Sequence, residues 1–245
     1  MNERLSPGTL PDVSGLSVGI LGGTGPQGRG LAYRLARAGQ RVQLGSRSAD
    51  RGASAAAEIA ALPGLPTAAN GSGPSADSSG RLVTGGDNAH ACDADVVILA
   101  VPWDGHAELI ADLAGRLVGK IVVDCANPLG FDAQGPFVLP VSEGSAAQQA
   151  AALLPDSRVC AAFHHVSAVL LADPEVASID LDILVLGDDP AAVAVVQALA
   201  TRIDGMRGIH AGRLRNAAQV EGLTANLIAM NRRYKAHAGI RVTDV

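Results

Sequence analysis

The sequence predicts an α/β protein whose centre is a doubly wound parallel sheet, followed by a small, mainly helical C-terminal part. Candidate strands that are continuously apolar alternate with helical patterns along most of the chain, which is typical of a parallel sheet covered by helices on both faces. A glycine-rich turn directly follows the first strand. Aromatic residues make up only 2% of the chain and 29 residues are glycine, so helices with small side chains can pack closely on the sheet. Together these observations favour a Rossmann-type fold.

Length and composition exclude several classes of protein. The 245 residues suffice for one large α/β domain, or for one domain with a small appendage. A net charge of −5 argues against a general nucleic-acid binder, and the few aromatic residues argue against base stacking on single strands. The longest apolar run, 96–101, is too short to span a membrane. The start of the chain has no apolar stretch typical of a signal peptide.

The cysteines indicate a reducing environment. Cys92, Cys125 and Cys160 are more than 30 residues apart along the chain, a spacing that fits neither a disulfide framework nor a zinc site. We therefore expect buried, reduced thiols in a cytoplasmic protein. The sequence also contains no cluster of candidate metal ligands, so we predict no metal.

The first half of the chain alternates between strands and helices. After a polar arm, 1–14, we expect strands at 16–21, 41–45, 81–84, 95–101 and 120–124. Helical patterns lie at 31–38, which Gly39 ends as a C-cap glycine, at 48–62, around His90 and at 104–117. The segment 63–80 is rich in Gly, Pro, Ser and Asn, and its lack of periodicity predicts an exposed loop.

The second half continues the pattern and then becomes helical. We expect a helix at 145–154, strands at 158–162 and 182–187, and a helix that starts at Asp189-Pro190 with Asp as N-cap. Apolar residues at helical spacing then run from Leu214 to Met230. We divide the chain into the arm 1–14, a dinucleotide-binding Rossmann domain at 15–187 and a smaller C-terminal domain at 188–245.

The strongest functional motif is a G-x-G-x-x-G between the first strand and the first helix. It consists of Gly23, Thr24, Gly25, Pro26, Gln27 and Gly28. In dinucleotide-binding sites the first glycine makes the tight turn, the second lets the backbone approach a pyrophosphate, and the third lets helix and strand pack closely. The N-terminus of the helix then presents free N–H groups to the phosphates. The bland interpretation is a structural glycine-rich turn.

The end of the second strand indicates NADP rather than NAD. A site that prefers NAD places an acidic residue there to hold the ribose hydroxyls, whereas this chain offers Ser46, Arg47 and Arg51. A hydroxyl and two guanidinium groups suit a 2′-phosphate, which a carboxylate would repel. The alternative is that Arg47 and Arg51 are ordinary surface residues.

Two later strand ends are candidate walls for the nicotinamide. Val101 and Trp103 end one strand, and Asn127 and Pro128 end the next. Ligands of open α/β sheets lie at the carboxyl ends of strands, near the point where the strand order reverses. Packing is the alternative role for the only tryptophan.

Acid–base machinery is sparse. His164 follows another strand end and is a candidate acid, base or hydrogen-bond donor, or else an inert loop histidine. The two lysines, Lys120 and Lys235, are not placed as the base of a carbonyl reductase. This scarcity suits hydride transfer between two coenzymes, which requires mainly that the two rings be held face to face.

Several segments together resemble one enzyme family, the NADPH-dependent coenzyme F420 reductases, or F420:NADP oxidoreductases. The resemblance covers nearly the whole chain from about Leu16. It is carried by GGTG at 22–25, GSR at 45–47, VPW at 101–103, VEGLT at 220–224 and NRRYKAHAGIR at 231–241.

The resemblance implies a Rossmann domain with a small C-terminal part, NADP(H) in the glycine-rich cleft and the deazaflavin coenzyme F420 stacked on the nicotinamide. It maps the catalytic residues onto His164 and Thr224, and the deazaflavin pocket onto Ala168, Leu227 and Ala238. The expected partners are these small molecules and a second copy of the chain, in a homodimer. Two departures stand out: the stretch 63–80 is longer than in archaeal members, and 132–138 is an insertion after Asn127-Pro128. In addition, Ala218 replaces an arginine of archaeal members. Arg215 and Arg232 are candidates to replace that arginine.

Two other functions stay open from the residues. One is an NADPH-dependent reductase of a small imine or ketone, for which His164 would be the proton donor. The other is a non-enzymatic module that senses NADP. Bleaching of oxidised deazaflavin by NADPH would separate both from the first hypothesis. The last segment, 201–245, carries eight basic and three acidic residues, and its excess of positive charge predicts a basic rim that attracts an anionic ligand.

Overall fold

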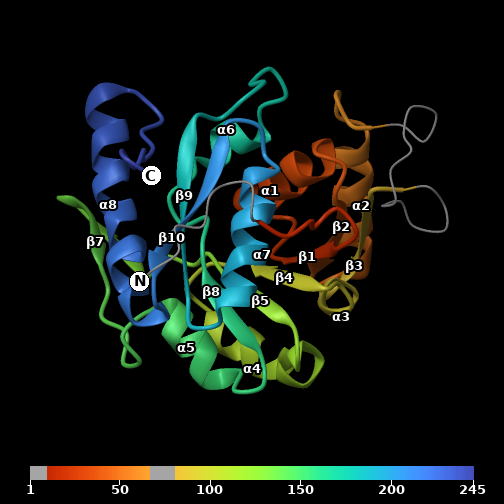
Figure 1. Cartoon of the computed structure of the whole chain (residues 1–245), viewed down its shortest axis with the longest axis horizontal. Coiled ribbons are helices and arrows are strands. Elements are labelled where there is room, and N and C mark those ends of the chain that lie inside the picture. Colours follow the sequence, from red (N-terminus) through yellow and green to blue (C-terminus); the bar gives the residue numbers. More distant parts are fainter. Residues whose placement is uncertain (1–9, 67–80) are drawn as a thin grey trace.

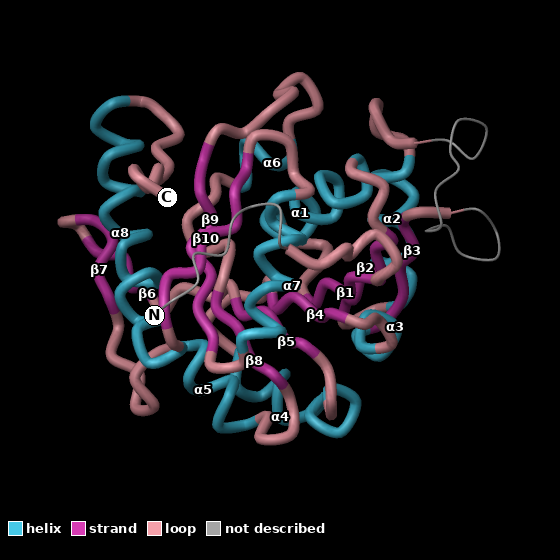
Figure 2. Tube along the Cα trace, in the orientation of Figure 1, coloured by secondary structure: helices cyan, strands magenta, loops and turns pink. Residues whose placement is uncertain are grey.

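The structure is a computed structural model that describes residues 10–66 and 81–245 (Figure 1). Most of the predicted arm and most of the predicted loop 63–80 lie outside the described residues. Helices cover both faces of a central eight-stranded sheet (Figure 2), which confirms the predicted Rossmann-type α/β fold. None of the described helices is long and apolar enough to cross a membrane.

Every predicted strand and helix is present, and four further elements occur where none was predicted, at 129–132, 135–138, 168–172 and 206–212. The strands are β1 Ser17–Leu21, β2 Arg41–Ser46, β3 Val83–Asp87, β4 Val96–Leu99, β5 Ile121–Asp124, β6 Leu129–Asp132, β7 Gly135–Val138, β8 Arg158–Ala161, β9 Leu181–Gly187 and β10 Met206–Gly212. The helices are α1 Pro26–Arg37, α2 Ala49–Ala60, α3 Asn88–Cys92, α4 His106–Leu117, α5 Ala146–Leu153, α6 Ala168–Ala172, α7 Pro190–Thr201 and α8 Ala217–Tyr234, which a 3₁₀ turn at Leu214–Asn216 precedes.

The strand order is β10-β9-β8-β5-β4-β1-β2-β3. The six neighbouring strands β8, β5, β4, β1, β2 and β3 are parallel and form the doubly wound order of a dinucleotide-binding fold. Strand β9, however, pairs antiparallel with β8, and β10 is parallel to β9. The prediction of a wholly parallel sheet is therefore wrong for β9, and the sequence predicted no strand at the position of β10. A continuously apolar strand looks the same in sequence whichever way it runs.

Each face of the sheet buries its own apolar core. On one face, α1, α2, α6 and α7 pack on strand residues such as Ile20 and Ile98. On the other face, α3, α4, α5 and the start of α8 cover Leu99 and Val122. Because successive side chains of a strand point to opposite faces, strands covered on both sides must be apolar throughout, as β1, β4 and β5 are.

Strand β10 extends the main sheet beyond the predicted domain boundary. It pairs with β9, and α7, which joins the two strands, packs against both. The division at 187/188 stays a prediction, with neighbouring strands contributed from its two sides. The predicted insertion after Asn127-Pro128 is part of a hairpin, β6 and β7, that packs on α8.

After α8 the chain folds back onto the edge of the sheet. The carboxylate of Asp182, which is fully buried, accepts hydrogen bonds from Arg207 at 2.6 and 2.7 Å, from Arg241 at 2.7 Å and from the backbone N–H of Val242 at 2.7 Å. The bonds from Arg207, above all, hold the pKa of Asp182 far below its ordinary value. Asp182 thus anchors the C-terminal segment to β9.

Candidate functional site

The turn between β1 and α1 has the geometry of an anion-binding loop. Gly22 has φ +77°, in the left-handed region that favours glycine, and the N–H of Gly25 bonds to the carbonyl of Gly22 at 2.9 Å. A Cβ on Gly28 would lie 2.5 Å from the Gly22 carbonyl oxygen, so only glycine lets the helix approach the strand. Pro26 occupies the first turn of α1, which has no acidic residue there. The free N–H groups of this helix therefore face a site suited to phosphate.

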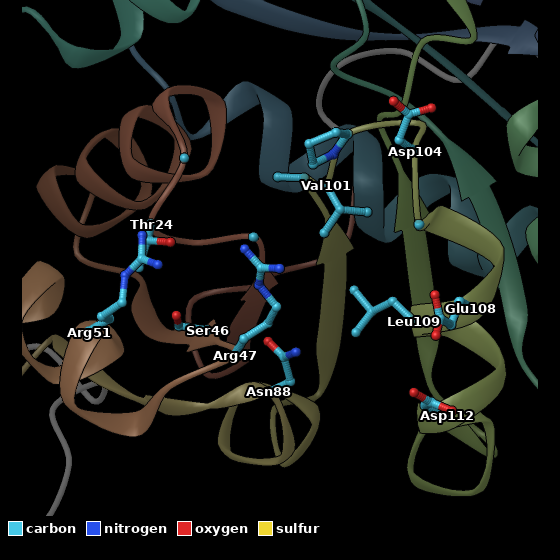
Figure 3. A pocket seen from close by; sticks show the side chains of 15 residues that line it. Thr24, Ser46, Arg47, Arg51, Asn88, Val101, Asp104, Glu108, Leu109 and Asp112 are labelled. Carbon is cyan, nitrogen blue, oxygen red and sulfur yellow. The ribbon is translucent and has the colours of Figure 1, made fainter.

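A cavity of about 700 Å³ opens beside this turn (Figure 3). It is lined by Gly22, Thr24, Gly25, Ser46, Arg47, Arg51, Asn88, Ala100, Val101, Pro102, Asp104, Gly105, Glu108, Leu109 and Asp112. Six residues predicted as cofactor-binding are in this set, from three segments distant in sequence. The structure thus brings together Thr24, Gly25, Ser46, Arg47, Arg51 and Val101.

The two walls of the cavity carry opposite charges. Arg47 and Arg51, both exposed, come from the end of β2 and the start of α2. Across the cavity, Asp104, Glu108 and Asp112 follow one another along α4 and the turn before it (Figure 3). The guanidinium groups on the β2 side suit the phosphate of a nucleotide.

A second cluster lies around the backbone of His164. The side-chain amide of Asn127 donates to the His164 carbonyl oxygen at 3.0 Å. The Thr224 hydroxyl lies 3.2 Å from that same oxygen and 3.2 Å from the Asn127 side-chain oxygen, and its one proton is shared between them. The structure therefore joins three predicted site residues, Asn127, His164 and Thr224, from three different elements.

One hydrogen bond links this cluster to the nucleotide-type turn. The side chain of Gln27 donates to the backbone oxygen of Phe163 at 3.1 Å. Phe163 is buried and has φ +64°, an uncommon conformation for a residue other than glycine. Gln27, predicted to bind cofactor, thus holds the segment that leads into His164.

The ring of His164 is neutral in this environment. Its side chain is 3% exposed, and neither ring nitrogen has a hydrogen-bond partner among the described residues. Burial lowers the pKa of His164 to about 4. An imidazole with such a pKa is uncharged at neutral pH, so it lacks the second ring proton that a general acid would donate. The neighbouring His165 behaves alike, because burial also lowers its pKa to about 4.

Two of the residues predicted for the deazaflavin, Ala168 and Ala238, lie on segments that contact each other. Ala168 begins α6, and Ser167 before it lies 3.1 Å, oxygen to Nδ1, from His237, the residue before Ala238. Ala168 and Ala238 are both partly accessible, whereas Leu227 on α8 is buried. Pro128, after Asn127, is buried as well.

Some predicted residues lie outside the lining of the cavity. Trp103 is flanked by Pro102 and Asp104, which line it, but its own ring lies against His106, with ring centroids 5.3 Å apart. Gly23 and Gly28 serve the turn instead: a Cβ on Gly23 would lie 2.7 Å from the Leu44 side chain.

Sequence reasoning missed Asn88 and the acidic wall. Asn88 follows β3, and the register pairs Ser46 with Asp87, so residues 47 and 88 leave neighbouring strand ends. The rule that ligands bind at the carboxyl ends of parallel strands could have identified Asn88. The spacing of Asp104, Glu108 and Asp112 also places them on one helix face. Among the described residues, no group of three or more His, Cys, Asp and Glu side chains is arranged to hold a metal.

Comparisons with a family model and with related sequences identify one family. Residues 17–128 match the family model described as NADP oxidoreductase, coenzyme F420-dependent. The chain is 36% identical over 236 residues to the F420-dependent NADP reductase of Methanothermobacter marburgensis, a match that covers 94% of this chain and 99% of the relative. It is 37% identical over 238 residues to the enzyme of the same name from Methanocaldococcus jannaschii, again over 94% of this chain and 99% of the relative.

A solved structure extends the likeness to the whole fold. It is that of a protein from Arthrobacter sp. FB24, proposed to be an F420-dependent NADP reductase. The TM-score is 0.73 at 26% identity, and the match covers 94% of this chain and all of the other.

Proposed function

This chain belongs to the family of F420-dependent NADP reductases, and from that premise we propose that it transfers a hydride between NADP(H) and coenzyme F420 at the site described above. The hydrogen bond from Gln27 to the Phe163 carbonyl carries the structural part of the proposal. It places the nucleotide-type turn directly against the segment that leads to His164, Asn127 and Thr224. Two ligands bound on the two sides of this contact would be neighbours.

The cavity beside β1 is the proposed NADP(H) site. Its fit rests on the free helix N-terminus at Gly25 and on Ser46, Arg47 and Arg51 at the end of β2. The helix end would hold the pyrophosphate, and the two guanidinium groups would hold the 2′-phosphate. Val101, at the end of β4, would contact the nucleotide between them.

The proposed deazaflavin site lies next to the second cluster. Its fit rests on the two ring nitrogens of His164, which are buried without a partner among the described residues and are available to a polar ligand. Thr224 and Asn127 hold the His164 backbone in place. Ala168 and Ala238 would form another wall of this site, and the buried Leu227 would pack behind the wall.

The two coenzymes supply the redox chemistry, in which one hydride leaves one ring and reaches the other. The chain contributes orientation and the exclusion of water. Because the pKa of His164 is about 4, its imidazole shapes the pocket and does not act as a general acid at neutral pH.

A direct assay tests this function. The purified protein is mixed with NADPH and oxidised F420, and the absorbance of the deazaflavin is followed. We expect it to bleach as NADPH is consumed in a one-to-one ratio, and to recover when reduced F420 is mixed with NADP. Oxidation of NADPH by small imines or ketones, without bleaching of F420, would favour the alternative reductase. NADPH binding without any turnover would favour the sensing module.

A homodimer and a cytoplasmic location complete the proposal. Large apolar side chains are exposed on β6, β7 and α8, namely Phe131, Phe137, Val138, Met230 and Tyr234. Exposed apolar surface of this kind marks interaction sites, and a second copy of this chain is the proposed occupant. Light scattering on the purified protein measures the assembly. The cytoplasmic location is supported by the three cysteines, all of which are described, buried and free.

A further inference from the structure

The only tryptophan rests on a buried histidine. Trp103 belongs to the segment between β4 and α4, whose other residues line the NADP(H) cavity. Its ring lies 5.3 Å from that of His106, at an angle of 35° between their planes. The backbone N–H of His106 also bonds to the Trp103 carbonyl at 3.1 Å. The position of Trp103 therefore depends on His106.

The hydrogen bonds of His106 fit a ring that carries a proton on both nitrogens. Its side chain is fully buried. Nε2 lies 2.6 Å from a carboxylate oxygen of Asp124, and Nδ1 lies 3.2 Å from the side-chain oxygen of Gln149. The amide nitrogen of Gln149 donates to Glu143 at 3.3 Å, which leaves its oxygen toward His106. With an acceptor at each nitrogen, the ring is an imidazolium paired with a carboxylate.

The electrostatic surroundings agree with this assignment. Burial alone would lower the pKa of His106, but the hydrogen bond and the charge of Asp124 outweigh it and raise the pKa above its ordinary value. The acidic groups that face His106 are Asp124 at the end of β5, Glu221 on α8 and, through Gln149, Glu143 before α5.

Asp124 extends the contact to the second cluster. Its other carboxylate oxygen accepts from the backbone N–H of Ala126 at 2.8 Å. Ala126 immediately precedes Asn127, whose amide holds the His164 carbonyl. The pair His106–Asp124 thus touches the segment of Trp103 on one side and the segment of Asn127 on the other.

Stability alone does not explain why charges are buried here. Taking an ion pair out of water is costly, and well-packed apolar residues often replace such a pair without loss of stability. A fixed distance between the two segments is something that apolar packing supplies less well.

We propose that His106 and Asp124 are positioning residues for hydride transfer, which set Trp103 and the loop of Asn127 relative to each other on the two sides of the reacting rings. This inference rests on the proposed function. It predicts that loss of the pair slows the chemical step while the binding of NADPH, through Arg47 and Arg51, stays nearly intact.

The intrinsic fluorescence of Trp103 reports on the contact between its indole and the His106 ring. It is measured separately from activity. A protonated imidazole quenches a neighbouring indole, whereas a neutral one does so far less. The protein without coenzymes is excited where tyrosine does not absorb, from about pH 5 to about pH 9. We expect the emission of the wild type to be quenched relative to that of His106→Gln, and the emission of His106→Gln to be bright and independent of pH.

Kinetics of the same variants complete the test. We expect His106→Gln and Asp124→Asn to lower kcat about tenfold to a hundredfold and to change KM for NADPH less than about threefold. His210→Gln, at an exposed position on β10, is the matched control and should leave emission and kcat unchanged. Circular dichroism establishes that each variant is folded. Should Asp124→Asn fail to fold, His106→Gln, whose amide still donates to Asp124, decides the matter.

The outcomes are distinguishable. A wild-type emission as bright as that of His106→Gln, or a His106→Gln variant with kcat within about twofold of the wild type, overturns the inference. A wild type whose emission is quenched relative to His106→Gln but which does not bleach F420 with NADPH overturns the proposed function instead, since the fluorescence is measured on the protein alone.

Discussion

The Thr224 hydroxyl lies 3.2 Å from the backbone oxygen of His164, although the two residues are 60 positions apart in sequence. This contact joins α8 to the loop after β8. One turn earlier on α8, the buried carboxylate of Glu221 accepts from the N–H groups of Ala146 and Ala147 at 2.9 and 3.1 Å. Two polar contacts from one helix face thus fix α8 against the start of α5 and the loop after β8, and with it the proposed deazaflavin wall.

Arg47→Ala should weaken NADPH binding much more than NADH binding. A charge-assisted bond to phosphate contributes about 1.5–3 kcal/mol, which corresponds to about a tenfold to hundredfold change in Kd. Titration calorimetry with both nucleotides measures it. Arg158→Ala removes an exposed arginine at the start of β8, at the opposite end of the sheet, and should change neither affinity. Equal losses for NADPH and NADH would contradict the assignment of the 2′-phosphate site.

His164→Ala should slow turnover only modestly. Because burial lowers the pKa of His164 to about 4, its loss should cost less than the roughly 10²–10⁴-fold of a general acid. The pH profile of kcat between about pH 6 and pH 8 should keep its shape. A steep loss of kcat together with the disappearance of an ionisation near neutral pH would show that His164 transfers a proton.

Glu221 should make stability dependent on pH. Burial raises its pKa from 4.5 to about 7, against the lowering effect of the N–H groups of Ala146 and Ala147. A folded-state pKa above the unfolded one means that the stabilising contribution is complete below about pH 4.5 and is lost as the pH rises through about 7. Between these values the free energy of unfolding should fall by at most about 1.4 kcal/mol per pH unit relative to Glu221→Gln.

Urea unfolding of the wild type and Glu221→Gln across this pH range measures the difference. Glu175→Gln, at an exposed position, controls for the loss of one carboxylate. A wild type that gains stability relative to Glu221→Gln as the pH rises would show that the carboxylate is stabilised in the folded state.

Arg232 and Arg233 should attract the deazaflavin by charge. The predicted basic rim is smaller than the sequence indicated, because Arg241 pairs with Asp180 and Asp182 and Arg213 lies 3.8 Å from Asp188. Arg232 and Arg233, in the last turn of α8, are exposed and form no ion pair within the described residues. The anionic tail of F420 would feel them through screened forces that reach about 10 Å at 0.1 M salt.

The double variant Arg232→Gln/Arg233→Gln should raise KM for F420, weaken its salt dependence and leave KM for NADPH nearly unchanged. Steady-state assays over a range of salt concentrations measure this. Arg116→Gln/Arg158→Gln removes the same charge elsewhere and is the control. Parallel increases for both coenzymes, or unfolding, would indicate that these arginines support the helix.

Local sequence sufficed for the parts of the site that follow one strand end. The turn at Gly23–Gly28 and the triplet Ser46, Arg47 and Arg51 could be predicted because a parallel strand brings its carboxyl end to a known edge of the sheet. The predicted helix at 214–230 was also nearly right, and the structure extends it to Tyr234.

Contacts between distant segments could not be predicted in this way. Three features depend on how helices pack on the finished sheet. They are the pairing of His106 with Asp124, the direction of β9 and the packing of the Trp103 ring on His106. Leu227 illustrates the same limit: the resemblance maps it to a pocket, but helix phase alone does not say how deeply it is buried.

The guanidinium of Arg34 has a consequence for the order in which the coenzymes bind. It is buried in α1 and donates to the backbone oxygens of Leu170, Leu171, Asp173 and Val176, at 2.6, 2.9, 2.8 and 2.6 Å. Helix α1 starts at the nucleotide turn and α6 at Ala168, so one side chain ties a wall of each proposed site to the other. These two walls are held together by hydrogen bonds of the chain itself. We therefore expect random addition of the two coenzymes, with initial-rate plots that intersect and with each coenzyme binding in the absence of its partner.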